Sequence, residues 1–218
     1  MLGPSFAVAA DIPRLVNEEL FPDERLYIAG AVEKRQAEFG TARICARRAL
    51  AQLGVSPCSL VPHIDRSPSW PRGIVGSIAH TEGFCVAAVT NATEVAGFGV
   101  DVEQDRPLAP ELEPLICTNT ERLWIARQSP EMQRSLGMMF FSAKEAFYKC
   151  QYATTKAFLD FQEVELNINL GDRSFSVAHI GRGGPEWTSV RLIKGKFGHL
   201  SGLIFTAAIL ASEAVNCL

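Results

Sequence analysis

The chain has 218 residues, of which 47% are hydrophobic and 21% charged, and its formal net charge is −3. This composition is typical of a folded globular protein and excludes a disordered chain. The small net charge argues against nucleic acid as a partner, and no apolar run approaches the roughly 18 residues that would span a bilayer.

The six cysteines contain no C-x-x-C pair and have no metal-ligand spacing with the four histidines. Several lie in apolar runs, which predicts buried free thiols in a reducing compartment. No basic region precedes the mildly apolar start, so we expect no signal peptide. The sequence therefore predicts a cytoplasmic protein without a membrane anchor.

Residues 1–30 are interrupted by prolines and are expected to form short strands and turns. Apolar residues at helical spacing then predict a helix from Val32 to Leu53, which Gly54 ends. This helix is unusually basic, and Arg43 and Arg47 share one face because they are four residues apart. Arginines in such a position either solubilise a helix or bind phosphate, and the pattern alone leaves both open.

A proline-rich loop over residues 65–73 precedes two predicted strands, 74–78 and 84–89, joined by a turn that contains His80. The next apolar strand, 95–102, ends by displaying Asp101 and Glu103. Side chains alternate across a strand, so these two carboxylates point to the same side and can coordinate one cation.

Proline and acidic residues dominate positions 104–114, which we interpret as a linker between two halves. A short helix is expected over 120–127, capped by Asn119 or Thr120, and a long helix over 133–151. Glu145 and Lys149 share a face of the long helix. With the two strand carboxylates they form a plausible site for a hard metal bound to phosphate oxygens, although each pair alone also fits an ordinary solvated surface.

The remaining chain predicts strands over 164–170, 175–180, 187–193 and 202–210. His80 and His199 are each followed three residues later by a glycine and then by an apolar strand. This echo suggests an internal duplication, in which we assign His199 a structural role.

The stretches G-F-G-V-D-V-E (97–103) and F-S-A-K-E-A-F-Y-K (141–149) together resemble the signature of the 4′-phosphopantetheinyl transferases. The similarity is closest to the larger, monomeric branch that includes the enterobactin-synthetase activating enzymes, and it covers roughly residues 30 to 165. The resemblance implies an α+β pseudo-twofold fold of two similar halves, each with a long helix packed on an antiparallel sheet. The halves would be residues 1–104 and 105–218, with the active site in the cleft between them.

The resemblance also implies an activity, the transfer of 4′-phosphopantetheine from coenzyme A to a serine of an acyl or peptidyl carrier protein. Adenosine 3′,5′-bisphosphate is the other product. Mg²⁺, or alternatively Mn²⁺, would be held by Asp101, Glu103 and Glu145. Glu145 and Lys149 would be catalytic, with Glu145 acting as base, as ligand or as both. Lys144 is expected to be solvated or to touch a coenzyme A phosphate.

Coenzyme A would be bound through basic and hydroxyl side chains that match the family's motifs. Arg47 best fits the residue at the 3′-phosphate, and many relatives have a serine where this chain has Ala79. The expected coenzyme A ligands are Arg43, Arg47, Arg66, Ser77, His80 and Lys149. Position and composition suggest that Arg122, Trp124 and Arg127 receive the acidic carrier, whose pathway (fatty-acid, siderophore or polyketide) the sequence does not distinguish.

Two other functions are weighed. The Ala79 departure would suit a catalytically silent module that binds coenzyme A or a carrier without transfer. The carboxylates alone would suit a metal-dependent phosphohydrolase, which leaves the paired motifs unexplained. The retention of Asp101, Glu103, Glu145 and Lys149 favours the transferase.

Overall fold

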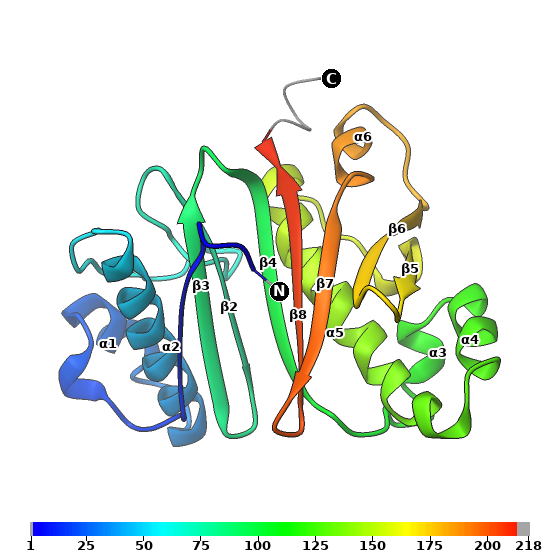
Figure 1. Ribbon diagram of the computed structural model, residues 1–218. Coiled ribbons are helices and arrows are strands. Elements are labelled where there is room, and N and C mark those ends of the chain that lie inside the picture. The colour runs from blue at the N-terminus through cyan, green and yellow to red at the C-terminus, as the bar shows by residue number, and fades with distance from the viewer. Residues whose placement is uncertain (1, 213–218) are drawn as a thin grey trace. The chain divides into compact units, whose positions relative to one another are not determined.

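The computed structural model describes residues 2–212, which form two compact units. The first unit spans residues 2–94 and the second residues 95–212. The strand that carries Asp101 and Glu103 therefore groups with the C-terminal residues. Figure 1 labels the elements of both units. None of the helices in the described part of the chain is both long and apolar enough to cross a membrane.

The first unit packs one long helix against a small antiparallel sheet. Its sheet has the order β1-β3-β2, made of β1 (Ala7–Asp11), β2 (Ile74–Thr81) and β3 (Phe84–Asn91). The helix α2 (Glu33–Gln52) buries an alanine-rich face against β1 and β3. It ends as predicted at Gly54, whose φ of +75° suits a residue without a side chain. A short helix, α1 (Pro22–Ile28), and a 3₁₀ turn, η1 (Asn17–Glu19), lie where only strands and turns were expected.

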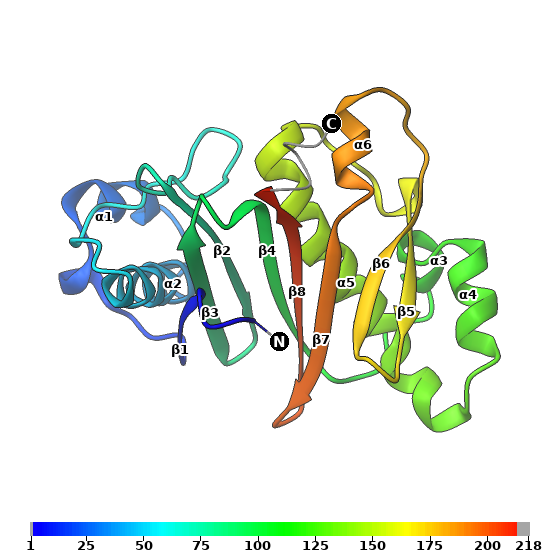
Figure 2. The same cartoon turned by 45° about the horizontal axis from the view of Figure 1, so that its top comes forward.

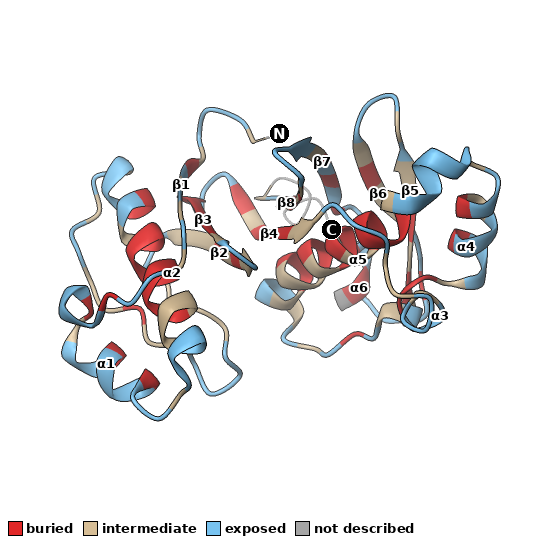
Figure 3. Cartoon of the chain, turned by 90° about the horizontal axis from the view of Figure 1, so that it is seen from below, coloured by how far each residue is buried: buried red, intermediate tan, exposed pale blue. Residues whose placement is uncertain are grey.

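The second unit also packs a long helix on an antiparallel sheet, which confirms the predicted fold class. Its five strands follow the order β4-β8-β7-β6-β5, with β4 (Val95–Gln104), β5 (Val164–Asn169), β6 (Ser174–Ile180), β7 (Lys194–Leu200) and β8 (Leu203–Ala211). The helix α5 (Pro130–Thr155) lies along β4 and β8, as Figures 1 and 2 show. Figure 3 shows the buried stripe that each long helix carries on one face.

The smaller elements of the second unit border α5. They are α3 (Glu113–Ile116), α4 (Asn119–Ala126), the 3₁₀ turn η2 (Phe161–Glu163) and α6 (Glu186–Val190). The α4 cap is Thr118, not Asn119 or Thr120, because Thr118 and Glu121 form a reciprocal capping box. Ser129 caps α5 with Pro130 in its first turn.

One predicted strand is wrong. Residues 186–190 form α6 and the strand begins only at Lys194. The aromatic and β-branched residues of this segment favour a strand locally. Its buried members, however, are Trp187, Val190 and Ile193, whose spacing of three fits a helical turn against the core.

The repeated histidine pattern corresponds to two similar hairpins. His80 pairs with Cys85 across the β2–β3 turn, and His199 pairs with Ile204 across the β7–β8 turn. Gly83 and Gly202 have nearly the same positive φ, +74° and +75°. Each unit thus contains a hairpin of the same register with a glycine in its turn.

Candidate active site

The two motif segments of the second unit lie on β4 and α5, which touch at glycines. A Cβ added to Gly99 would lie 2.0 Å from the Ala146 carbonyl oxygen, and one added to Gly97 would lie 2.6 Å from that of Cys150. Along the same face of β4, Asp101 follows Gly99 and lies against α5. The glycines of the first motif therefore allow the close approach that brings the strand carboxylate to the helix.

Asp101 is 6% exposed and its two oxygens have different environments. The Lys149 ammonium donates hydrogen bonds to Asp101 Oδ1 at 2.7 Å and to the Val100 carbonyl at 3.1 Å. Asp101 Oδ2 is buried and accepts no hydrogen bond from any described residue. A buried carboxylate oxygen without a partner is costly, so this atom is suited to a cation or a donor supplied by a ligand.

Glu145 is half-buried one turn before Lys149. Burial raises the pKa of the Glu145 carboxyl above its ordinary value, the Lys149 charge partly opposes this shift, and the Asp101 charge adds to it. A carboxylate with a raised proton affinity is a better proton acceptor near neutral pH.

The three carboxylates are not gathered into a finished metal site. Among residues 2–212, no group of three or more histidine, cysteine, aspartate or glutamate side chains is arranged to hold a metal ion. Glu103 is half-buried at the end of β4, and Lys149 occupies one oxygen of Asp101. The donor chemistry and the unpartnered Asp101 Oδ2 fit a hard cation, whereas the predicted set of three ligands stays a prediction.

A cavity of about 240 Å³ adjoins Glu145 within the second unit. Its walls are mostly apolar and aromatic, with Tyr148 and Phe158 in contact at a ring-centroid distance of 6.1 Å. The lining residues are Lys144, Glu145, Phe147, Tyr148, Phe158, Leu159, Asp160, Phe161 and Val164. A mostly apolar hollow with a titratable group at its edge is a typical small-molecule site.

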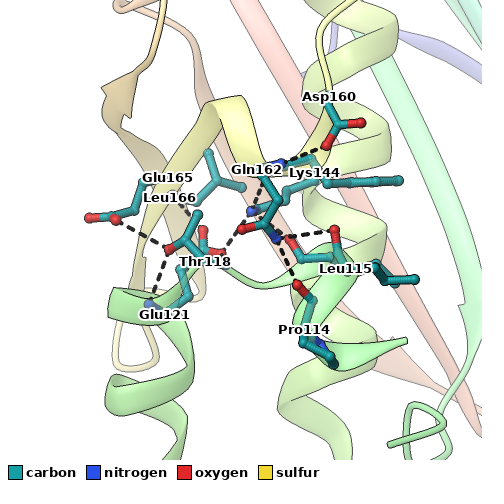
Figure 4. A network of polar contacts seen from close by, with 11 residues as sticks. Pro114, Leu115, Thr118, Glu121, Lys144, Asp160, Gln162, Glu165 and Leu166 are labelled. Carbon is teal, nitrogen blue, oxygen red and sulfur yellow. Dashed lines mark hydrogen bonds and ion pairs between the residues drawn. The ribbon is translucent and has the colours of Figure 1, made fainter. Parts of the chain in front are cut away.

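Lys144 is not solvated, which corrects the sequence-based expectation. It is 1% exposed, and its ammonium forms an ion pair with Glu121 Oε2 at 2.7 Å. It also donates to the carbonyls of Ile116 and Phe161, each at 2.8 Å (Figure 4). All three of its N–H donors therefore have protein acceptors, and none is left for a phosphate.

In the first unit, Arg47 is engaged with the protein. Its Nη1 donates to both oxygens of the fully buried Glu24, at 2.8 and 2.9 Å, and its Nη2 donates to the Glu19 carbonyl. Glu24 in turn accepts from the backbone N–H groups of Phe21 and Leu60. Arg47 thus joins the N-terminal segment to α2.

Arg43 is 5% exposed, and its Nε donates to the Leu60 carbonyl at 2.7 Å. Its guanidinium stacks 4.1 Å above the Phe39 ring. Burial lowers the pKa of Arg43 to about 10, Glu24 opposes the shift, and the charge of Arg35 adds to it. Arg43 remains a cation at neutral pH, close enough to Arg35 to feel its charge.

Arg35, which was not among the predicted ligands, meets His80. Arg35 Nη1 donates to His80 Nε2 at 3.1 Å, and the side chains are about half and one-third exposed (51% and 35%). Glu38 lies nearby, 3.6 Å from Arg35 and 3.8 Å from His80 Nδ1. We define Arg35, Arg43 and His80 as the α2–β2 cluster, whose positive charge comes from the two arginines of α2.

The other predicted coenzyme A ligands lie apart from this cluster in the sheet or in a loop. Ser77 and Ala79 are buried on one face of β2, whereas His80 points to the face that α2 covers. A serine at position 79 would therefore place its hydroxyl on the face of β2 opposite His80. Arg66 is exposed in the loop before β2 and has a positive φ of 66°.

The residues predicted to receive a carrier lie on α4 or at its end. Arg122 pairs with Glu113 at 3.2 Å, with both side chains exposed. Trp124 packs edge-on against Phe140 at 5.9 Å, and Arg127 is exposed at the end of the helix.

Two signals in the sequence could have identified the residues that were missed. The neighbours of Lys144 at i±3 and i±4 are Phe140, Phe141, Phe147 and Tyr148, which indicates a buried lysine. Thr118 and Glu121 have capping-box spacing. No comparable signal distinguishes Arg35 from the other basic residues of α2, because its partner His80 comes from a distant strand.

The sequence of the chain is similar to those of known proteins over both units. The 4′-phosphopantetheinyl transferase N-terminal domain family matches residues 23–90, and the 4′-phosphopantetheinyl transferase superfamily matches residues 97–198. The chain is 37% identical to 4′-phosphopantetheinyl transferase Svp of Streptomyces mobaraensis, over 98% of this chain and 89% of that protein. It is 32% identical to 4′-phosphopantetheinyl transferase PptT of Mycobacterium tuberculosis, over 93% of this chain and 97% of that protein.

A shorter similarity links the chain to enterobactin synthase component D of Salmonella typhi, 37% identical over 58% of this chain and 51% of that protein. The family matches and the nearly full-length relatives define the class. The chain belongs to the 4′-phosphopantetheinyl transferase superfamily, in its larger type, and is a transferase of that kind.

Proposed function

We propose that the protein transfers the 4′-phosphopantetheine group of coenzyme A to a serine hydroxyl of an acyl or peptidyl carrier protein. The observation that carries the proposal is the arrangement of Asp101, Glu145 and Lys149 on the two motif elements, with Asp101 Oδ2 buried and unpartnered. A phosphohydrolase could use the same carboxylates with water as the acceptor, but the superfamily match favours transfer to a second substrate.

In the proposed reaction the serine oxygen attacks the β-phosphorus of coenzyme A. The bond between that phosphorus and the oxygen bridging to the α-phosphate breaks, so adenosine 3′,5′-bisphosphate leaves with the bridging oxygen. Glu145 accepts the serine proton, which its raised pKa favours. Lys149, already held at Asp101, supplies positive charge near the pyrophosphate.

We propose a divalent cation, Mg²⁺ or Mn²⁺, as cofactor, held by Asp101 and Glu145 with Glu103 as third ligand. Phosphate oxygens and clustered carboxylates repel one another, and a bound cation would neutralise both. Asp101 Oδ2 supports this assignment because it is the buried oxygen that no described side chain satisfies.

For the 3′-phosphate of coenzyme A we propose Arg35 and His80, with Arg43 adding charge, in place of Arg47. Arg47 would have to abandon the buried Glu24 to bind a ligand, which leaves a carboxylate uncompensated. Arg35 would lose only its partly exposed contacts with His80 and Glu38 on binding a phosphate. The negative charge of Glu38 repels a phosphate at this position, so it lowers the affinity for coenzyme A.

The test of this subsite compares coenzyme A with dephospho-coenzyme A, which lacks the 3′-phosphate. Arg35→Ala should weaken coenzyme A binding about tenfold and leave dephospho-coenzyme A unchanged, since a charge-assisted hydrogen bond contributes on the order of 1.5–3 kcal/mol. Glu38→Gln should strengthen coenzyme A binding. Arg48→Ala, which removes an exposed contact to Asp11, is the matched control. Equal losses for both ligands would contradict the assignment.

We further propose that the cavity beside Glu145 receives the pantetheine arm. The arm is attached to the β-phosphate, so it must lie next to the proton acceptor when that phosphorus reacts. The apolar walls suit its methylene and dimethyl groups, and Tyr148 and Asp160 offer polar atoms at the edge.

For the carrier we keep Arg122, Trp124 and Arg127 as the proposed docking residues. An acidic partner would compete with Glu113 for Arg122, a surface pair of small intrinsic stability. Arg122→Glu should raise the KM for the carrier without changing that for coenzyme A. Arg134→Glu on an exposed part of α5 is the control, and equal effects of both reversals would argue against this surface.

The activity itself is tested by mass spectrometry of an apo-carrier incubated with the protein, coenzyme A and Mg²⁺. Transfer adds about 340 Da to the carrier, and EDTA or Glu145→Gln should abolish the gain. Carriers of fatty-acid, siderophore and polyketide pathways assayed in parallel identify the substrate. If all stay unmodified while coenzyme A binds, the protein is a binding module instead.

We also propose that the protein acts as a cytoplasmic monomer. Its five described cysteines are free, as expected in a reducing compartment. Gel filtration of the protein at micromolar concentration tests the oligomeric state.

A further inference from the structure

Lys144 is a buried charge that the proposed chemistry does not use. Its neighbour Glu145 borders the reaction site, while the Lys144 side chain runs to the opposite partners shown in Figure 4. A buried ammonium is costly unless every donor is satisfied, and here each has an acceptor within 2.8 Å. We therefore infer that Lys144 has a structural role at its three acceptors.

The ion pair connects α5 with four other segments. Lys144 holds the end of α3 through Ile116 and the start of η2 through Phe161. Glu121 binds Lys144 from α4 and accepts from the Leu166 N–H of β5 at 2.8 Å. Because Glu121 also accepts from the Thr118 N–H, the same carboxylate caps its own helix.

One of these links reaches the cavity wall, which Lys144 itself also lines. Residues 158–161 line the cavity opposite Glu145 and Tyr148, and Phe161, whose carbonyl Lys144 binds, is the last residue of that run. Gln162 adds contacts from this turn to the carbonyls of Pro114 and Leu115. Phe161 also packs on Phe141 of α5 at 5.7 Å. Residues 158–160 belong to no helix or strand and η2 begins at Phe161, so contacts with other elements hold this segment near α5.

We propose that Lys144 and Glu121 are positioning residues that hold the 158–161 wall against α5 and so set the shape of the cavity for the pantetheine arm. The inference rests on the proposed function of the cavity. Neither residue touches the reacting atoms. Their effect is on the ligand that the wall contacts, and misplacement of a binding wall by about 1 Å can cost on the order of 10²-fold in binding or rate.

The experiment separates positioning from simple stability. Lys144→Met alone leaves Glu121 buried without its partner and is expected to lower Tm strongly. The double variant Lys144→Met/Glu121→Gln removes both charges and keeps one acceptor oxygen, which can accept from either the Thr118 or the Leu166 N–H group. Ser142→Ala is the matched control, since it removes a buried polar contact of the same helix to Thr206 of β8, away from the cavity.

Two ligands are titrated by calorimetry, coenzyme A and adenosine 3′,5′-bisphosphate, which lacks the pantetheine arm. We expect the double variant to recover most of the Tm yet to bind coenzyme A about tenfold or more weakly, with the bisphosphate affinity unchanged. Ser142→Ala should keep both affinities. The inference is overturned if the double variant binds coenzyme A like the wild type, or if both ligands weaken in parallel.

Transfer by the wild-type protein is measured separately with an apo-carrier. Absence of transfer would refute the proposed function, whereas the two-ligand comparison would still report whether Lys144 and Glu121 shape the cavity. The two failures are thus distinguishable.

Discussion

Asp101 illustrates how one side chain can serve structure and chemistry with different atoms. Oδ1 is held by Lys149, while Oδ2 is buried and unpartnered among the described residues. The contact with Lys149 holds the carboxylate in place, and Oδ2 is the atom that the proposed cation would bind. The cost of the unpartnered oxygen is expected to disappear when a cation binds.

Addition of Mg²⁺ should therefore raise the Tm of the wild-type protein. A ligand that binds only the folded state stabilises it by about 2.7 kcal/mol at a concentration of 100 Kd. Asp101→Asn should abolish this Mg²⁺-dependent increase, as measured by differential scanning fluorimetry with and without EDTA. An equal increase in the variant would exclude Asp101 as a ligand.

The cysteines make a second residue-scale prediction. Burial raises the thiol pKa of Cys45 to about 11 and those of Cys85 and Cys117 to about 12, so little thiolate exists at pH 8. Cys58 is only half-buried. Iodoacetamide at pH 8 should label Cys58 well before these three, as peptide mass spectrometry can show. Labelling of all four at similar rates would contradict the described burial.

At the scale of elements, the contact between β4 and α5 determines the site. The glycines of β4 allow backbone atoms of α5 to approach where any side chain would collide. Phe98 and Val102, on the other face of β4, are buried as well. The glycines thus determine how closely the Asp101 face of the strand approaches α5.

Gly99→Ala should push β4 away from α5, because its Cβ would overlap the backbone of Ala146. We expect a destabilisation of about 1–3 kcal/mol, typical of overpacking, together with loss of the Mg²⁺-dependent Tm increase. Denaturant unfolding measures the first effect. As a control, Gly202→Ala removes a turn glycine of positive φ in the same unit and should destabilise without changing the Mg²⁺ response.

Much of this architecture could be predicted from the sequence. Periodicity located α2, α5 and β4, since each has a long apolar pattern that tertiary packing reinforces. The predicted strand over 187–193 was wrong. The residues of this segment prefer a strand locally, but the burial of Trp187, Val190 and Ile193 at helical spacing stabilises a helix more.

The site could be predicted only in part. The motifs predict Asp101, Glu145 and Lys149 as site residues, and the structure pairs Asp101 with Lys149 within one unit. The partners of Lys144 and Arg47 could not be predicted, because Glu121 and Glu24 are distant in sequence and no local pattern pairs them. For the same reason, Arg35 was identified only through its contact with His80.

At the scale of the whole molecule, each unit has an apolar core of its own. Leu50 of α2 packs with β1 and β3 residues in the first unit, while Phe147 of α5 packs in the core of the second. Each unit therefore has its own source of stability. The two sets of proposed ligands are supported by different cores.

Leu50→Ala should lower hydrogen-exchange protection mainly within residues 2–94. The change removes buried methyl groups and typically costs about 2–5 kcal/mol. Protection of α5 and β8 should change less, as mass-spectrometric exchange can resolve. Equal loss of protection across residues 95–212 would mean that the chain unfolds as one cooperative unit.

The glycine-mediated contact of β4 with α5 also limits how this chemistry can be re-engineered. A designer who transplanted the carboxylate strand into another scaffold would have to transplant α5 with it. The glycine at position 99 serves to let the backbone of this helix approach, and it has no such use without the helix. The helix in turn would require an acceptor for Lys144 equivalent to Glu121. The smallest portable module is therefore larger than either signature: strand, helix and the capping segment that neutralises the buried lysine.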